Sequence, residues 1–303
     1  MDADLDTLLT ALYVEIDDHV IAGRRGPGRP RRLSDAELAC LAVAQVLLGF
    51  ASERRWLRFA RTRLGHLFPY LPHQPGYHKR LKAAAPLLAA VIDHLARQAP
   101  CWHDQIRLIH ATPLPCGTSR ETAKRSDLAG WAGYGYCSSH SRFYWGLKLY
   151  VIATPDGMPV AWCLASPKIG EREVAAALLA HARRNHALRP GLILIGDNGF
   201  AGREFEQLVT ASFRLSLVRP DRRDEVPRHG SIGWIRQWIE SIFDTLKGQL
   251  PGRTRRPHRP RRLHPHRPAP AGHGRRHLAQ LGHRRARQTL PYRLRPLSWE
   301  SVI

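Results

Sequence analysis

The stretch LILIGDNGF, residues 192–200, decides how this chain is expected to fold. Its first four residues are all apolar, which predicts a central strand that is buried on both faces of a sheet. Asp197 follows this strand, so its carboxylate is expected at the strand's carboxyl end. In open α/β sheets that edge is where sites form. A purely local role is the alternative, because turns also favour Asp for its hydrogen bonds to nearby backbone.

The segments around this stretch alternate between strand and helix patterns. Their predicted order is β-β-β-α-β-α-β-α, which indicates a mixed α+β fold with helices flanking the sheet. A turn is expected at 154–157, where Thr-Pro-Asp-Gly separates two strands. Strands are predicted at 106–109, 143–153, 159–165, 192–195 and 214–218, and helices at 171–184, 202–211 and 232–250.

Residues 1–100 are expected to form an N-terminal helical domain. Apolar residues recur at helical spacing from Leu5 to Ile16, and Ser34 with Glu37 predicts a capping box at the start of a second helix. A further helix is expected at 52–64, and prolines at 69, 72 and 75 are expected to break the chain before a helix at 81–96. An arginine-rich helical domain is typical of a DNA-binding module, although a helical bundle with a solvated basic surface has the same pattern.

A basic stretch, Arg24–Arg32, lies between the first two predicted helices. Its central Gly-Arg-Pro resembles an AT-hook, which enters the minor groove of DNA. Arg29 and Arg31 are therefore candidate DNA-binding residues. A flexible basic linker that contacts only phosphates is the alternative.

The chain as a whole is strongly basic, with 47 Lys and Arg against 25 Asp and Glu and a net charge of +22. A surplus of this size indicates a polyanionic partner, most often nucleic acid. Thirteen of the arginines fall in 251–293, which has seven prolines and no acidic residue. Residues 251–303 are therefore expected to form a disordered basic tail. It is either a phosphate-gripping segment or, as its lysine-free composition favours, the product of out-of-frame translation beyond Leu250.

Several protein classes are excluded by composition. Five scattered cysteines without a C-x-x-C pair indicate reduced thiols in a cytosol and no zinc site or disulfide framework. The first residues lack the pattern of a signal peptide. The longest apolar run, Leu38–Leu48, is too short to cross a membrane.

A second candidate site lies on the predicted helix at 232–250. Arg236, Glu240 and Lys247 are at positions i, i+4 and i+11, which places them within about 60° of one another on one stripe of the helix. Glu240 could bind a metal ion while the two cations contact phosphates. The alternative is an ordinary Arg–Glu pair on the helix surface.

These motifs occur together in one known family. The chain resembles insertion-sequence transposases that have an RNase H-like DDE core, over roughly residues 5–250. The resemblance implies a transposase domain at 101–250 with the predicted strand and helix order. The family usually has a Tyr three residues before the Arg of the helix motif, where this chain has Gly233. The motifs that carry the resemblance are Thr118–Trp131, Trp145–Leu149, Gly196–Phe200 and the Arg-x3-Glu-x6-Lys pattern of Arg236, Glu240 and Lys247.

The resemblance implies metal-dependent phosphoryl transfer to and from DNA. Three carboxylates would hold two divalent ions, Mg²⁺ or Mn²⁺, with Asp197 and Glu240 as metal ligands. One ion activates water or a DNA 3′-hydroxyl, and the other stabilises the leaving oxygen. The implied partners are double-stranded DNA, as terminal inverted repeats and target DNA, and a second copy of the chain. The implied setting is the bacterial cytoplasm at the nucleoid, with no membrane.

The first family carboxylate is missing. The family has Asp-x-Thr-Pro at the end of the first strand, and this chain has His110-Ala111-Thr112-Pro113. A neutral imidazole offers one nitrogen and no negative charge, so it cannot bridge two hard cations. It suits Mn²⁺ or Zn²⁺ better than Mg²⁺. The sequence thus predicts a transposase impaired at the catalytic position of His110, with a rate loss of at least about a thousandfold.

Two other function classes fit the same sequence. A catalytically inactive remnant would bind element ends without cutting them. A host RNase H-like nuclease would cut without preference for terminal repeats.

Overall fold

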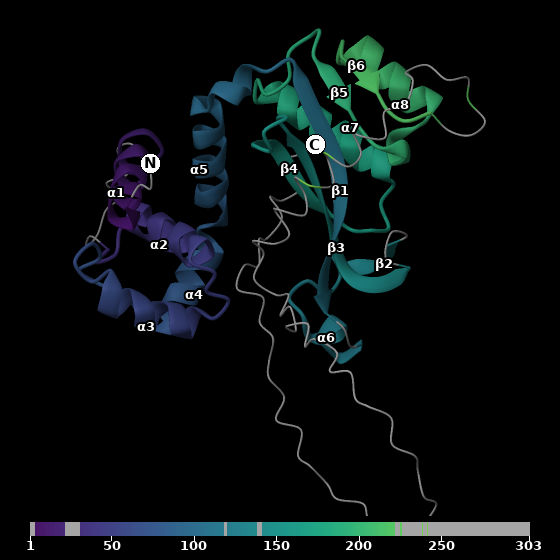
Figure 1. The fold of residues 1–303 in the computed structure, drawn as a ribbon. Coiled ribbons are helices and arrows are strands. Elements are labelled where there is room, and N and C mark those ends of the chain that lie inside the picture. Colours follow the sequence, from purple (N-terminus) through teal and green to yellow (C-terminus); the bar gives the residue numbers. More distant parts are fainter. Residues whose placement is uncertain are drawn as a thin grey trace, which may run out of the picture.

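The computed structural model describes residues 4–21, 31–117, 120–137 and 141–221, together with residues 225, 238 and 241. The chain begins with five helices (Figure 1). They share a core of their own, in which Trp56, Tyr77 and Leu41 are fully buried. This confirms the predicted helical N-terminal part. The helices are α1 (Leu5–His19), α2 (Asp35–Leu47), α3 (Glu53–Arg63), α4 (Gln74–Ala83) and α5 (Ala85–Gln98).

Local sequence signals explain where these helices begin. The hydroxyl of Ser34 accepts a hydrogen bond from the Glu37 N–H at 3.0 Å, and the Glu37 carboxylate accepts one from the Ser34 N–H at 2.5 Å, which is the predicted capping box. The helical pattern predicted at 81–96 covers the end of α4 and most of α5, which are separate helices. Pro75 and Pro86 lie in the first turn of α4 and α5, where the missing N–H has no helical partner to lose. Pro75 therefore begins a helix instead of breaking one.

The second part of the chain is a six-stranded mixed sheet. Strand β3 is antiparallel to β1, β2 and β4, whereas β5 is parallel to β1 and β6 is parallel to β5. Strands β4 and β2 follow one another along the edge of β3 that β1 does not occupy. The strands are β1 (Ile106–Gly117), β2 (Gly133–Cys137), β3 (Arg142–Ala153), β4 (Pro159–Ala165), β5 (Ile193–Ile195) and β6 (Ser216–Val218).

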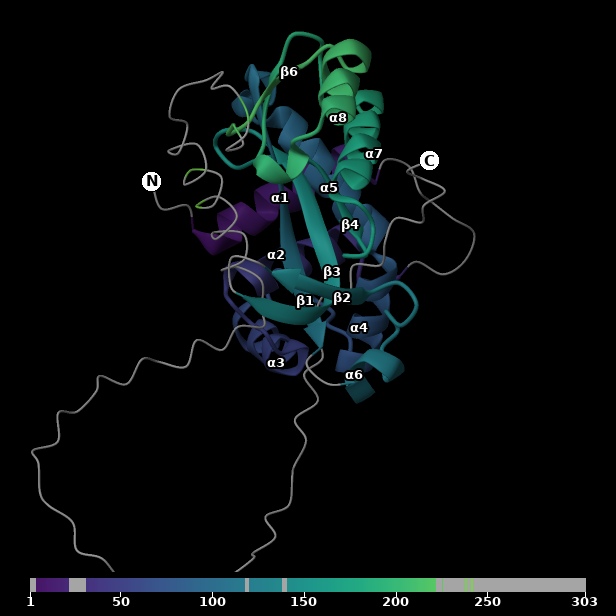
Figure 2. The ribbon, with the colours of Figure 1, turned by 90° about the vertical axis from the view of Figure 1, so that its right-hand side faces the viewer.

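Two apolar clusters cover the two faces of this sheet. Ile109, Tyr150 and Leu194 point toward α7 (Glu171–Arg184) and α8 (Arg203–Gln207), which lie on one side of the strands (Figure 2). The neighbouring residues Leu108, Val151 and Ile195 form a smaller cluster on the other face. The central strand is thus buried on both faces, as its apolar run predicts. The described helices and the mixed sheet confirm the predicted mixed α+β fold class.

Several strand ends differ from the prediction. Strand β1 continues to Gly117 through Pro113 and Pro115, although the sequence predicts an end at Ile109. Beyond Leu108, β1 pairs only with β3 among the described residues, so both ring nitrogens can face the other edge, where no N–H is needed. The turn at 154–157 is confirmed, with Gly157 at φ +88° and its N–H bonded to the Thr154 carbonyl at 2.9 Å. Helix α6 (Arg120–Arg125) and strand β2 are not predicted from the sequence.

Some predictions concern residues that the structure does not describe. Within the predicted helix at 232–250 only Trp238 and Ser241 are described, and both are helical. The tail at 251–303 lies outside the described residues, and the domain boundaries at 100 and 250 stay predictions. Among the described helices, none has the length and apolar character needed to cross a membrane.

Candidate active site

Asp197 lies where β5 ends and a short 3-10 helix, Asn198–Phe200, begins. It is the N-cap of that helix, and its Oδ1 atom accepts a hydrogen bond from the Gly199 N–H at 2.9 Å. The local turn role is therefore satisfied by one carboxylate oxygen. Its Oδ2 atom lies 3.5 Å from the imidazole of His110.

His110 reaches this position from the neighbouring strand. In β1, Leu108 is paired with Ile195 of the parallel strand β5, so His110 lies two residues beyond that pair. The two strands therefore deliver His110 and Asp197 to one edge of the sheet, with His110 Nδ1 and Asp197 Oδ2 3.5 Å apart. The His110 side chain is 17% exposed and the Asp197 side chain 35% exposed, so both are partly buried.

The surroundings keep Asp197 ionised. Burial raises the pKa of its carboxyl group. The hydrogen bond and charge of His110, the Gly199 N–H and the ammonium of Lys148 together lower this pKa by more than burial raises it. The net effect is a pKa below the ordinary value for Asp. The carboxylate is therefore negatively charged at neutral pH, the form that binds a divalent cation.

Two charged residues that the sequence analysis did not select lie at the same edge. Glu171 begins α7, and its Oε1 atom lies 3.3 Å from the Lys148 ammonium on β3. A Cβ atom added to Gly199 would clash with Glu171 Oε2 and would lie 3.0 Å from Asp197 Oδ1. The two carboxylates thus flank Gly199. In the sequence, Glu171 is an acidic residue in the first turn of a predicted helix and Lys148 lies in the Trp145–Leu149 motif of the resemblance, but neither signal indicates this contact.

Most of the other predicted site residues are outside the described part of the chain. These are Glu240, Arg236 and Lys247 of the last predicted helix and Arg29 of the basic stretch. Trp238 is described, and it packs against the cluster of Leu108, Val151 and Ile195. His110 is paired with Val151 and points to that same face.

Arg31 is the one described residue of the predicted basic DNA contact. Its guanidinium lies 2.8 Å from the Asp35 carboxylate, one turn away, and its side chain is 68% exposed. Asp35 also pairs with Arg80 at 2.6 Å. Arg31 is thus held at the start of α2 with most of its surface in solvent, and its role in DNA binding stays a prediction.

The donor atoms at the sheet edge fit one divalent cation. Asp197 Oδ2 is not used by the cap, and His110 adds an imidazole nitrogen beside it. This nitrogen–oxygen set suits Mn²⁺ or Zn²⁺ better than Mg²⁺. A pair of ions needs further oxygen ligands, because a histidine cannot bridge two metals.

Comparisons with solved structures give distant likenesses. The chain is similar to a piggyBac transposase in a synaptic complex with hairpin DNA, at 10% sequence identity and a TM-score of 0.37 over 72% of this chain and 49% of that chain. It thus spans about half the length of that transposase. It is also similar to a Mos1 transposase paired-end complex with the left transposon end, at 11% identity and a TM-score of 0.25, over 74% of this chain and 75% of that one. A Mos1 mariner paired-end complex with Mn gives 10% identity and a TM-score of 0.25, over 79% and 80% of the two chains.

No protein-family model and no curated protein sequence matches the chain. The fold class stated above rests on the strand order and pairing, not on these distant likenesses.

Proposed function

We propose that this chain is a DNA transposase of the DDE type, impaired at its first carboxylate position. The observation that carries the proposal is the placement of Asp197 beside His110. Asp197 follows the end of β5, and His110 lies on the adjacent strand β1. Their side chains are 3.5 Å apart at one edge of the sheet. The transposase resemblance assigns its first two carboxylate positions to these two residues.

In this proposal the divalent cation supplies Lewis-acid activation of an attacking oxygen. Asp197 would hold the cation, while the Gly199 N–H fixes the orientation of its carboxylate through Oδ1. Glu240 is proposed to supply the last carboxylate. Trp238, two residues before it, packs on the face of the sheet that carries His110, and this contact supports the proposal.

The basic side chains of the chain are proposed to contact the DNA backbone. Arg236 and Lys247 are proposed to contact phosphates near Glu240, and Arg29 and Arg31 to contact DNA from the N-terminal part. The net charge of +22 supports a polyanionic partner. The further proposals are paired terminal inverted repeats and target DNA as substrates, a homodimer on DNA, and a nucleoid location.

His110 is the reason for the proposed impairment. At this position the resemblance requires an oxygen ligand with a negative charge, and an imidazole removes that charge from a site that must hold two cations. The loss corresponds to several kcal/mol of metal affinity or transition-state stabilisation, and hence to at least about a thousandfold in rate.

The presence of His110 at the first carboxylate position also favours one alternative, a DNA-binding remnant that cuts no strand.

The test is a cleavage assay on DNA that carries the terminal repeats of the encoding element, with Mg²⁺ or Mn²⁺ and a parallel salt-dependent binding titration. The original chain is compared with H110D, D197N and E240Q.

The proposal predicts that H110D cuts at the repeat ends at least about a thousandfold faster than the original chain with Mg²⁺, and that adding D197N or E240Q to H110D abolishes the gain. Salt-sensitive binding by every variant without cutting, even by H110D, would establish the remnant. Cutting without preference for the repeat ends would indicate the host nuclease instead.

A further inference from the structure

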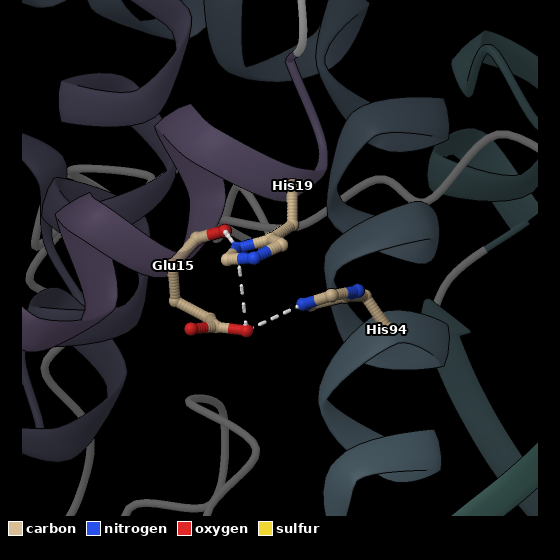
Figure 3. Close-up of side chains that lie close together, drawn as sticks. All are labelled: Glu15, His19 and His94. Atoms are coloured by element: carbon tan, nitrogen blue, oxygen red, sulfur yellow. Dashed lines mark hydrogen bonds and ion pairs between the residues drawn. The ribbon is translucent and has the colours of Figure 1, made fainter.

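A second group of metal-binding side chains lies far along the sequence from the candidate active site. Glu15 and His19 are one helical turn apart on α1, and His94 projects from α5 toward them (Figure 3). His94 Nε2 lies 2.7 Å from Glu15 Oε1, and His19 Nδ1 lies 3.6 Å from the same oxygen. Three potential ligands from two helices therefore converge on one point.

The spacing of these atoms matches what a metal ion requires. One ligand atom from each residue can be chosen so that all three lie within 4.8 Å of one another. In a tetrahedral zinc site with bonds of about 2.0–2.2 Å, ligand atoms are separated by roughly 3.3 Å. The distances of 2.7 and 3.6 Å fall on either side of that value. The His19 side chain is 52% exposed and near the end of α1, so its ring can adjust.

The neighbours of the cluster hold it in this arrangement. Gln98, one turn after His94 on α5, donates to Glu15 Oε1 at 2.6 Å and lies 3.2 Å from His94 Nε2. The rings of His19 and His94 are stacked at a centroid distance of 5.4 Å and an interplanar angle of 19°. A partner that orients a ligating carboxylate is a usual part of a metal site.

The chemistry of the donors selects the kind of ion. Two imidazoles and one carboxylate are the protein ligands of many zinc sites, with water in the fourth position. The side chains of Glu15 and His94 are 30% and 23% exposed, so a water ligand has access. Mg²⁺ prefers six oxygen ligands and does not suit this set.

We propose that Glu15, His19 and His94 bind one Zn²⁺ ion, or a divalent cation of similar character, that ties α1 to α5. Helix α5 packs against β4, so the ion would connect the first helix of the chain to the helix that contacts the sheet. This proposal does not depend on the proposed transposase function.

The experiment needs a local measurement, because the chain has 17 histidines and five cysteines that could also bind Zn²⁺. Hydrogen–deuterium exchange of α1 is followed in the full chain with Zn²⁺, with Mg²⁺ and without added metal. At a free Zn²⁺ concentration ten times the dissociation constant, bound metal should slow local opening by about tenfold.

The matched control is H66Q. His66 forms a similar contact with Asp6, at 2.6 Å, and no third metal ligand joins that pair among the residues that the structure describes. Its loss should therefore leave zinc protection of α1 unchanged. H94Q and H19Q should each abolish that protection, and Mg²⁺ should give none. H19Q keeps the test valid if H94Q perturbs packing, because His19 is the more exposed residue. Zinc protection that persists in H19Q, or that is absent from the original chain, would overturn the proposal.

Discussion

Replacing His110 by Asp would place a second carboxylate beside Asp197, and this perturbation tests the geometry of the site without any DNA. Without a divalent cation the two negative charges repel, so the H110D protein should be less stable than the original chain. With Mg²⁺ bound between them, the folded state should regain that stability. If residues 110 and 197 share a cation, H110D should show both the loss of stability without metal and its recovery with Mg²⁺.

The magnitude follows from the 3.5 Å separation of His110 Nδ1 and Asp197 Oδ2. Two unit charges about 4 Å apart interact by about 4 kcal/mol at an effective dielectric constant of 20 and by about 1 kcal/mol in water. The Asp197 side chain is 35% exposed, so solvent screening brings the cost toward the lower value. We expect a loss of about 1–2 kcal/mol, which corresponds to a fall in Tm of roughly 2–8 °C.

The assay is thermal unfolding of H110D with and without Mg²⁺, compared with H110N. The asparagine has nearly the same size as the aspartate but no charge, so it isolates the electrostatic effect. Mg²⁺ at 100 times its dissociation constant should stabilise H110D by about 2.7 kcal/mol, and H110N much less. Equal stability of the two variants without metal, and no response to Mg²⁺ in either, would refute the adjacency of residues 110 and 197.

Three further predictions concern stability. S34A should lower the free energy of unfolding, measured with urea, by about 1 kcal/mol, because the Ser34 hydroxyl caps α2. S34T should retain most of this stability, because threonine also has a capping hydroxyl. R219Q should cost about 3 kcal/mol or more, because Arg219 is nearly fully buried between the carboxylates of Glu206 and Glu225, and a cost below 1 kcal/mol would show that the network is not formed. The lowered pKa of Asp197 stabilises the fold above the unfolded value of about 4, and this contribution is lost as the pH falls through the lower folded value, so D197N should lose less stability than the original chain between pH 6 and 2.

Local patterns predicted the elements whose signals lie within a single segment. Helix α7 spans Glu171–Arg184 and strand β4 spans Pro159–Ala165, as their sequences predict, because apolar periodicity and turn residues mark both ends. The extension of β1 to Gly117 was missed, because it depends on pairing with β3, which lies far away in the sequence. Pro113 and Pro115 argue against a strand in the sequence. They are tolerated because, among the described residues, β1 has a neighbour on only one edge there.

The contacts of the candidate site also divide into those that the sequence predicts and those that depend on distant pairing. The approach of His110 to Asp197 follows from the topology, because parallel neighbouring strands end at one edge of a sheet. The contact between Lys148 and Glu171 could not be predicted, because it depends on the register of β3 and on where α7 begins over the sheet. Their sequence separation of 23 residues gives neither of these.

Helices α1 and α5 illustrate a further limit. Glu15 and His19 share a helical face by spacing alone, but His94 is brought to them only by the packing of the N-terminal core. Most of the 17 histidines of the chain lie outside this cluster, so the histidine content does not indicate which of them bind a metal.

In the proposed site Asp197 and Glu240 share at least one of the two divalent cations. Iron-directed cleavage of the backbone measures this, because Fe²⁺ with ascorbate and peroxide cuts the chain beside the residues that bind the ion. If the two residues share an ion, the chain should be cut near both positions 197 and 240. Mn²⁺ should compete with this cleavage, and both cuts should be lost together in D197N and in E240Q. Cleavage near only one of the two positions, or cuts at 240 that persist in D197N, would contradict it.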